Sequence, residues 1–352
     1  MQLKEHQKES IKRDLRLGIG LVIVLALVFG SYLVSVPISV FQTLTSFIFF
    51  LVFISFYLLQ ANTTLLKTIR ADAADQSKII FVVPAVAWLA SAVYALLSGQ
   101  FDPALLAKGL LFCLVPAAFV YLNAKRLQPS GWLDLLIVIS LWFPIEFGLI
   151  NGLTLPPTRG LAEVYHLIGI ALVIFFFFGV RGLRDVGFTF RLKDKDIRIA
   201  VQNFIIFMPF ALVIGMATGF IAISDRLPSG MEMLASFIGI LFFIAIPEEI
   251  LFRGVIHNLI EKKLSDRKNG VMIALAISSV VFGLAHGNNN NPPFLDINFG
   301  PLGVWHAPWV YLLLATFAGF FYGWTFIKTR KVTAAAIVHL LVDWVWSTFF
   351  AG

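Results

Sequence analysis

Charged residues are scarce in this chain. Asp, Glu, Lys and Arg make up 13% of its 352 residues, about half of the share found in soluble globular domains. Hydrophobic residues make up 59%, and the mean hydropathy is +0.87. This composition excludes a soluble domain. It predicts an all-α protein, a polytopic bundle of transmembrane helices.

Cysteine is nearly absent as well. The single cysteine, Cys113, lies inside an apolar run, which excludes an intramolecular disulfide and a cysteine-based metal cluster. The net charge is +7, yet the basic residues lie in short connections between apolar runs. That distribution is typical of membrane topology and not of nucleic-acid binding. We therefore expect the lipid bilayer as a partner and no nucleic acid.

Long apolar runs are abundant. Reading runs of roughly 17 to 25 residues as spans predicts about eleven transmembrane helices. They cover residues 17–36, 40–59, 79–98, 104–122, 132–151, 165–182, 199–222, 234–260, 270–286, 309–327 and 332–350. Basic residues gather in alternate connections, at 4–16, 67–78, 125–126, 181–198, 262–268 and 328–331. This alternation predicts a cytoplasmic N-terminus and an external C-terminus.

A basic connector divides the predicted bundle in two. We expect an N-terminal transmembrane bundle at residues 1–180, to which the sequence assigns no role. Residues 181–198 form a cytoplasmic connector rich in Lys and Arg. A second transmembrane domain follows at residues 199–352, and it holds the polar motifs of the chain.

Two adjacent carboxylates lie in the middle of the eighth predicted span, at Glu248 and Glu249, followed by Arg253. Ionisable groups at this depth are costly unless they pair or face a wet cavity, so they indicate a functional site. Glu249 and Arg253 share one helix face at i, i+4 spacing, with the acid on the N-terminal side as a helical ion pair prefers. Glu248 is left without a cation of its own. Such a carboxylate can take a proton from water and return it to a leaving amine.

Two later spans carry histidines at the same helical spacing. Phe282 and His286 lie one turn apart in the ninth span, and His339 and Asp343 in the last. Each pattern also has a structural interpretation. Glu249 with Arg253 can be a clamp between helices, His286 an interfacial residue, and His339 with Asp343 a buried hydrogen-bonded pair.

Three motifs therefore follow one another on successive apolar helices: Glu248-Glu249-x-x-x-Arg253, Phe282-x-x-x-His286 and His339-x-x-x-Asp343. Over about residues 199–350 the chain resembles the CAAX protease and bacteriocin-processing family of intramembrane glutamic endopeptidases. That family includes the type II CAAX prenyl proteases and bacterial proteins often labelled abortive-infection. The third motif departs from the prenyl protease form, which has Asn where this chain has Asp343.

The resemblance implies a membrane-embedded endopeptidase in a bacterial plasma membrane. It would hydrolyse membrane-associated proteins or peptides without a metal ion. Its catalytic set would be Glu248, Glu249, His286, His339 and Asp343, supported by Arg253 and Phe282. Glu248 and His286 would activate a water. His339 with Asp343 would stabilise the oxyanion, an effect worth roughly 3 to 4 kcal/mol per donor.

Other functions are consistent with the same residues. Two histidines and a glutamate are a familiar zinc set, but H-E-x-x-H spacing is absent from the sequence, so zinc is the less favoured alternative and no cofactor is expected. A proton-coupled transporter would use Glu248, Glu249 and His339 as a relay. That function predicts ionisable residues in the spans of both halves, whereas here they concentrate in the last four. A catalytically silent immunity or scaffold protein with the same fold is the third possibility.

Overall fold

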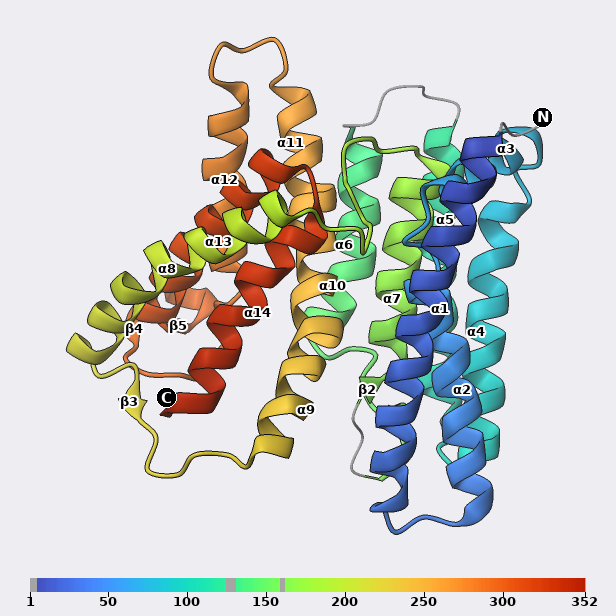
Figure 1. Ribbon diagram of the computed structural model, residues 1–352, viewed down its shortest axis with the longest axis horizontal. Coiled ribbons are helices and arrows are strands. Elements are labelled where there is room, and N and C mark those ends of the chain that lie inside the picture. Colours follow the sequence, from blue (N-terminus) through green and yellow to red (C-terminus); the bar gives the residue numbers. More distant parts are fainter. Residues whose placement is uncertain (1–4, 125–130, 159–161, 352) are drawn as a thin grey trace. The chain divides into compact units, whose positions relative to one another are not determined.

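The computed structural model describes residues 5–124, 131–158 and 162–351. The basic pair predicted at 125–126 lies outside these residues. The chain forms two compact units, and both are helical (Figure 1). Unit 1 comprises residues 1–184 and 188–191, and unit 2 comprises residues 185–187 and 192–352.

Unit 1 is built from seven α-helices in the described ranges. They are α1 (Glu5–Val34), α2 (Val40–Leu58), α3 (Thr63–Asp75), α4 (Ile79–Ser98), α5 (Pro103–Ala124), α6 (Trp132–Glu146) and α7 (Val164–Val173), the last continued by the π-helical stretch η1 (Ile174–Val180). Two short strands, β1 (Thr154–Leu155) and β2 (Ala162–Glu163), pair antiparallel before α7.

Unit 2 begins with α8 (Asp194–Ala217) and strand β3 (Ala222–Ile223). One long helix follows, made of α9 (Gly230–Ile240), η2 (Leu241–Ala245), α10 (Ile246–Glu249), η3 (Ile250–His257) and α11 (Asn258–Lys263). Figure 1 shows α9, α10 and α11 following one another along this helix. The remaining elements are α12 (Gly270–Leu284), β4 (Leu295–Asn298), the 3-10 turn η4 (Gly300–Leu302), β5 (Val304–Ala307), α13 (Trp309–Thr329), α14 (Val332–Phe349) and β6 (Phe350–Ala351).

The long helix has a clear start signal. Ser229 forms a capping box with Glu232: its hydroxyl accepts from the Glu232 amide at 3.3 Å, and its own amide donates to the Glu232 carboxylate at 2.7 Å. This arrangement satisfies amides that no helical carbonyl reaches. At the other end, Lys262 and Lys263 lie in the last turn, where positive charge favours the helix dipole.

Helix α13 is the central support of unit 2, since it contacts α8, α12 and α14. Its small residues allow this close packing. At Gly319, for instance, a Cβ atom would lie 3.2 Å from the Cα of Ser279 and 3.1 Å from a ring carbon of Phe282, both on α12. Glycine at this position lets the two backbones approach.

The protein is a polytopic helical membrane protein. Within the described residues, eight helices are long and apolar enough to cross a membrane: Lys12–Val34, Val40–Leu58, Ile79–Ser98, Pro103–Asn123, Asp194–Ala217, Gly230–Lys263, Trp309–Thr329 and Val332–Phe349. Val164–Val180 and Gly270–Leu284 are shorter apolar helices. Helix α12 has 15 residues, so it extends for about 22 Å against a hydrocarbon core of about 30 Å.

The prediction of about eleven spans is therefore supported for eight. A helix is present in each of the other three predicted ranges, but it is short. In the range 132–151, α6 ends at Glu146, and a turn with Gly148 at φ +62° follows. The sequence also gave no indication of α3, which fills a polar connection, or of the three two-stranded antiparallel pairs β1–β2, β3–β6 and β4–β5.

Candidate active site

The two glutamates lie where the long helix changes its winding. Glu248 and Glu249 end α10, a four-residue α-helical stretch between the π-helical stretches η2 and η3. Pro247 precedes them, and a proline has no N–H to give to the carbonyl one turn earlier. The missing hydrogen bond explains an interruption of the α pattern here. Insertions of π geometry occur frequently at functional sites.

Glu249 is completely buried and paired. Its Oε2 lies 3.1 Å from Nε of Arg253, and the exposed fractions of the two side chains are 0% and 1%. The Nη2 group of Arg253 donates to the carbonyl of Gly319 on α13 at 2.9 Å. The ion pair predicted from the i, i+4 spacing is therefore present. In addition, Arg253 ties the long helix to α13.

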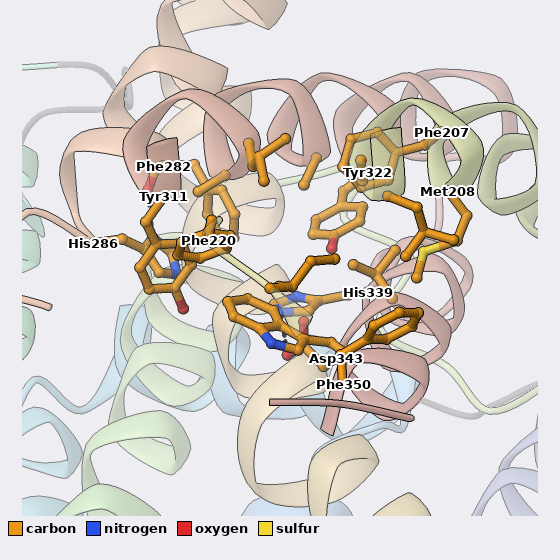
Figure 2. A pocket seen from close by; sticks show the side chains of 18 of the residues that line it. Phe207, Met208, Phe220, Phe282, His286, Tyr311, Tyr322, His339, Asp343 and Phe350 are labelled. Carbon is orange, nitrogen blue, oxygen red and sulfur yellow. Dashed lines mark hydrogen bonds and ion pairs between the residues drawn. The ribbon is translucent and has the colours of Figure 1, made fainter. Parts of the chain in front are cut away.

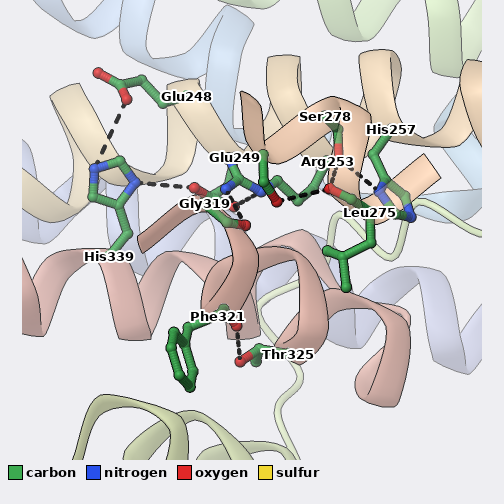
Figure 3. Close-up of polar contacts among 11 residues, drawn as sticks. Glu248, Glu249, Arg253, His257, Leu275, Ser278, Gly319, Phe321, Thr325 and His339 are labelled. Carbon is green, nitrogen blue, oxygen red and sulfur yellow. Dashed lines mark hydrogen bonds and ion pairs between the residues drawn. The ribbon is translucent and has the colours of Figure 1, made fainter. Parts of the chain in front are cut away.

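His339 on α14 lies among three carboxylates. Its Nδ1 is hydrogen-bonded to Oε1 of Glu249 at 3.0 Å, while its Nε2 lies 3.2 Å from Oδ2 of Asp343 and 3.8 Å from Oε2 of Glu248. Figure 3 shows His339 between Glu248 and Glu249, with Arg253 beyond Glu249. Both ring nitrogens can donate together only in the imidazolium form. The carboxylates thus surround a side chain that can carry positive charge.

His286 approaches the same site from α12. Its Nδ1 lies 2.8 Å from the carbonyl oxygen of Phe282. A carbonyl can only accept, so the proton is on Nδ1 and the neutral ring has a bare Nε2. Within the part of the chain that the structure describes, His286 has no hydrogen bond or ion pair to Glu248 or His339, but the ring lies within electrostatic reach of Glu248.

One cavity of about 220 Å³ brings four of the five predicted catalytic residues together: Glu248, His286, His339 and Asp343. Most of the other lining side chains are apolar or aromatic, and Figure 2 shows how they surround the polar groups. They are Phe207, Met208, Ala211, Leu212, Phe220, Ile221, Ile244, Phe282, Tyr311, Leu314, Ala315, Ala318, Tyr322, Val342, Trp346 and Phe350. Glu249 and Arg253 do not line it. Instead, Glu249 is hydrogen-bonded to His339, and Arg253 donates to the carbonyl of Gly319 on α13.

Aromatic rings form the support of the charged groups. The Arg253 guanidinium lies over the Phe282 ring, 4.4 Å from its centroid, and 5.3 Å from the Tyr322 centroid. Tyr322 stacks on His339 with a centroid distance of 4.7 Å and an angle of 16°. Phe282 thus packs against the guanidinium of Arg253. The sequence motifs gave no indication of Tyr322.

Several buried polar atoms of the site are not saturated. Oε2 of Glu248, Oε2 of Glu249, and Nε and Nη1 of Arg253 have no hydrogen-bond partner among the described residues. The 3.1 Å approach of Arg253 to Glu249 is an ion pair without hydrogen-bond geometry. Unsatisfied buried atoms are rare in native proteins, so each of these atoms calls for an explanation.

The far end of the long helix is held by a separate network. Nε2 of His257 lies 3.2 Å from Glu261, and Nδ1 lies 3.0 Å from the hydroxyl of Ser278 on α12. Glu261 accepts two hydrogen bonds of 2.8 Å from Arg330, which follows α13. These hydrogen bonds raise the pKa of the Arg330 guanidinium above its ordinary value. The network fixes the long helix against α12 and α13 at a distance from the cavity.

The donor set does not form a metal centre by itself. In the described ranges, no three or more His, Cys, Asp or Glu side chains are grouped so that they could hold a metal ion. Whether hydrolysis uses a metal is a question for the chelation experiment below.

Comparison with known proteins identifies the second unit. Residues 230–345 match the family described as type II CAAX prenyl endopeptidase Rce1-like. This segment is therefore a domain of that family, which confirms the resemblance carried by the three motifs, over a shorter range than residues 199–350. No curated protein and no solved structure matches the chain. A domain of this family in a polytopic helical membrane protein indicates an intramembrane protease.

Proposed function

We propose that the protein is an intramembrane endopeptidase that hydrolyses peptide bonds of membrane-associated proteins or peptides with a water activated by Glu248 and His286. The observation that carries this proposal is the placement of both groups on one largely apolar cavity, each with an atom that can accept a proton. A carboxylate and an imidazole of this kind are the usual groups of general base catalysis.

In the proposed reaction, the water lies between Glu248 and Nε2 of His286. Its oxygen attacks the peptide carbonyl carbon while its proton passes to this pair. The same proton is then delivered to the leaving nitrogen as the C–N bond breaks. His339 places positive charge beside the developing oxyanion, and it is oriented by Glu249 at Nδ1 and by Asp343 at Nε2. Arg253 and Phe282 hold this arrangement from behind.

The membrane arrangement is part of the same proposal. We assign about eleven spans, with the three shorter helices included, an N-terminus in the cytoplasm and a C-terminus outside a bacterial plasma membrane. The division of the chain at residue 184 supports a separate N-terminal bundle at 1–180, a connector at 181–198 and a catalytic domain at 199–352. The basic residues of that connector support its cytoplasmic location.

The test is hydrolysis by the full chain in liposomes. The substrates are quenched fluorescent peptides with apolar residues on both sides of the bond, in prenylated and unprenylated forms, and the reaction runs in water enriched in ¹⁸O. We expect cleavage that places ¹⁸O in the new carboxyl group and stops in Glu248→Gln. Proton flux across the liposomes without cleavage would instead indicate a transporter. A properly inserted protein with neither activity would indicate a silent scaffold or immunity protein.

A further inference from the structure

The oxyanion of the proposed reaction needs a hydrogen-bond donor, and the histidine nearest to it is already engaged. His339 has Glu249 at Nδ1, 3.0 Å away, and Asp343 and Glu248 at Nε2, 3.2 and 3.8 Å away. An oxyanion at Nε2 would have to displace a carboxylate and lie beside another. Ionised Glu248 and Asp343 are themselves acceptors only. The positive charge of His339 can still lie beside the oxyanion, but a further hydrogen-bond donor has to come from another part of the cavity wall.

His286 is not that donor either. Its Nδ1–H is used by the carbonyl of Phe282 at 2.8 Å, which leaves Nε2 as an acceptor in the neutral ring. The hydrogen bond thus prepares His286 to take a proton from water. It does not prepare His286 to give one to an oxyanion at the moment of attack.

Tyr311, on the first turn of α13, remains as a donor beside this base. Its ring lies 5.1 Å from the His286 ring, and it lines the cavity in a half-buried position. Its hydroxyl is within electrostatic reach of Asp343 and Glu248, and it interacts with the side chain of Asn289. Figure 2 shows Tyr311 and His286 together at one end of the cavity. A carbonyl attacked by water at His286 would therefore lie at the end of the cavity that Tyr311 also lines.

The other two neutral donors of the cavity are less suitably placed. Tyr322 is buried to 1% exposure, with its ring stacked on His339 at 4.7 Å, so it supports the imidazole. The Trp346 ring contacts Phe220 and Tyr311 at 5.1 and 5.4 Å. Among the ring contacts of the described residues, Trp346 has none with either imidazole of the cavity.

We infer that Tyr311 is a further catalytic residue, whose hydroxyl donates a hydrogen bond to the oxyanion of the tetrahedral intermediate. This inference rests on the proposed function. The water oxygen forms a bond to the carbonyl carbon, and the electron pair of the C=O double bond moves to the oxygen that Tyr311 binds. When the C–N bond breaks, that pair re-forms the C=O bond and the leaving nitrogen takes the proton held by His286 and Glu248. Tyr311 keeps its own proton throughout.

The test compares Tyr311→Phe with wild type in the liposome assay, using the best-cleaved peptide of the fluorescent set. Phenylalanine keeps the ring contacts with His286 and Trp346, so the fold is retained. We expect kcat to fall about 10²-fold, as for the loss of one oxyanion donor, with KM unchanged. A phosphonamidate analogue of that peptide, tetrahedral and anionic at the cleaved bond, should bind more weakly by a similar factor. The uncleaved peptide should bind Glu248→Gln and Glu248→Gln/Tyr311→Phe equally well.

Tyr121→Phe is the matched control. It removes a hydroxyl from α5 of unit 1, where the exposed Tyr121 ring packs on Phe81, and it should leave kcat and KM unchanged. If wild type cleaves the peptide and Tyr311→Phe has a kcat within about twofold of it, the role of Tyr311 is wrong, because the loss of one oxyanion donor has a far larger effect. A raised KM at constant kcat would lead to the same conclusion. The proposed function would still stand in both cases. A wild type that cleaves no peptide would overturn the proposed function first.

Discussion

Among the described residues, both units bury an arginine against a carboxylate, and the two pairs differ in how many of their polar atoms have hydrogen-bond partners. In unit 1, Nε and Nη2 of Arg181 donate to the two oxygens of Asp134 at 3.0 and 3.2 Å. Nη1 donates to the carbonyl of Asn123 at 3.0 Å, and the Asn123 amide donates to Asp134 at 2.9 Å. This cluster joins α5, α6 and the segment after η1, so it is a clamp.

In unit 2, the pair of Glu249 and Arg253 is just as deeply buried but incompletely bonded. Oε2 of Glu249 and two guanidinium nitrogens of Arg253 lack hydrogen-bond partners among the described residues, and so does Oε2 of the adjacent Glu248. Each unsatisfied buried group costs roughly 1 to 3 kcal/mol. The difference teaches that two equally buried ion pairs can differ in their hydrogen bonding, and that the pair next to the cavity is the less saturated of the two.

The largest difference is expected when each carboxylate is neutralised. Glu248→Gln should lower kcat by about 10³-fold or more, since it removes the proposed general base, with little change in stability because this side chain is 33% exposed. Asp134→Asn should do the opposite, because it leaves Arg181 buried without its counter-charge. Its activity per folded molecule should be normal, and its free energy of unfolding lower by about 3 to 5 kcal/mol. Peptide cleavage and unfolding in mixed detergent micelles measure the two effects.

That comparison has a clear opposite outcome. Equal cleavage by wild type and properly inserted Glu248→Gln would remove Glu248 from the chemistry. A loss of activity per folded molecule in Asp134→Asn would show that the clamp in unit 1 also takes part in function.

Removing the arginines should affect stability in both units and activity in one. Arg253→Ala leaves Glu249 stranded at 0% exposure and removes the bond to Gly319, and Arg181→Ala strands Asp134 at 1%. Each change should lower the free energy of unfolding by about 3 to 5 kcal/mol. Arg253→Ala should in addition reduce activity per folded molecule, because Glu249 orients His339. If Arg181→Ala reduces activity by the same factor, the contrast between clamp and site is wrong.

The contacts within single helices of unit 2 could be predicted from sequence, because they depend on local spacing. The i, i+4 separation of Glu249 and Arg253, and that of His339 and Asp343, determines a contact within one helix, and both contacts are present. Apolar runs of sufficient length likewise predicted the helices that can span a membrane. The approach of Glu249 to His339, 90 residues away, could be expected only from the order of the motifs.

The contributions of α13 could not be predicted in this way. Tyr311, Gly319 and Tyr322 belong to no motif, and their apolar surroundings are the same as those of any core helix. Their roles depend on which helices pack against α13, and single-sequence patterns do not determine that packing. A tyrosine beside small residues on a buried helix face is the available signal, since a buried hydroxyl requires a polar partner. The π-helical stretches on both sides of α10 were missed for a similar reason, although Pro247 marks the place.

A smaller effect is expected at Asp343, whose side chain is 29% exposed. An ionised Asp343 accepts from Nε2 of His339 at 3.2 Å. Asp343→Asn can still accept through its amide oxygen, but without the charge, and charge-assisted hydrogen bonds are about twice as strong as neutral ones. We expect kcat to fall about tenfold, which corresponds to about 1.4 kcal/mol, with an unchanged fold. Undiminished activity would show that a protonated Asp343, which Asn imitates as a donor, acts in the native site.

The smallest effect is expected from chelation, because most carboxylates of the site already have partners. The carboxylates that a metal would need are committed to other groups: Glu249 to Arg253 and His339, and Asp343 to His339. Tetrahedral zinc in a catalytic site takes three protein ligands, and in the described residues no three His, Cys, Asp or Glu side chains are grouped so that they could hold a metal ion. Prolonged dialysis against a chelator should therefore leave kcat within about twofold of its value before dialysis. The loss of a metal-activated water would lower kcat far more. Activity that is lost on chelation and restored by zinc would move Glu248, His286 and His339 from acid–base roles to metal ligands.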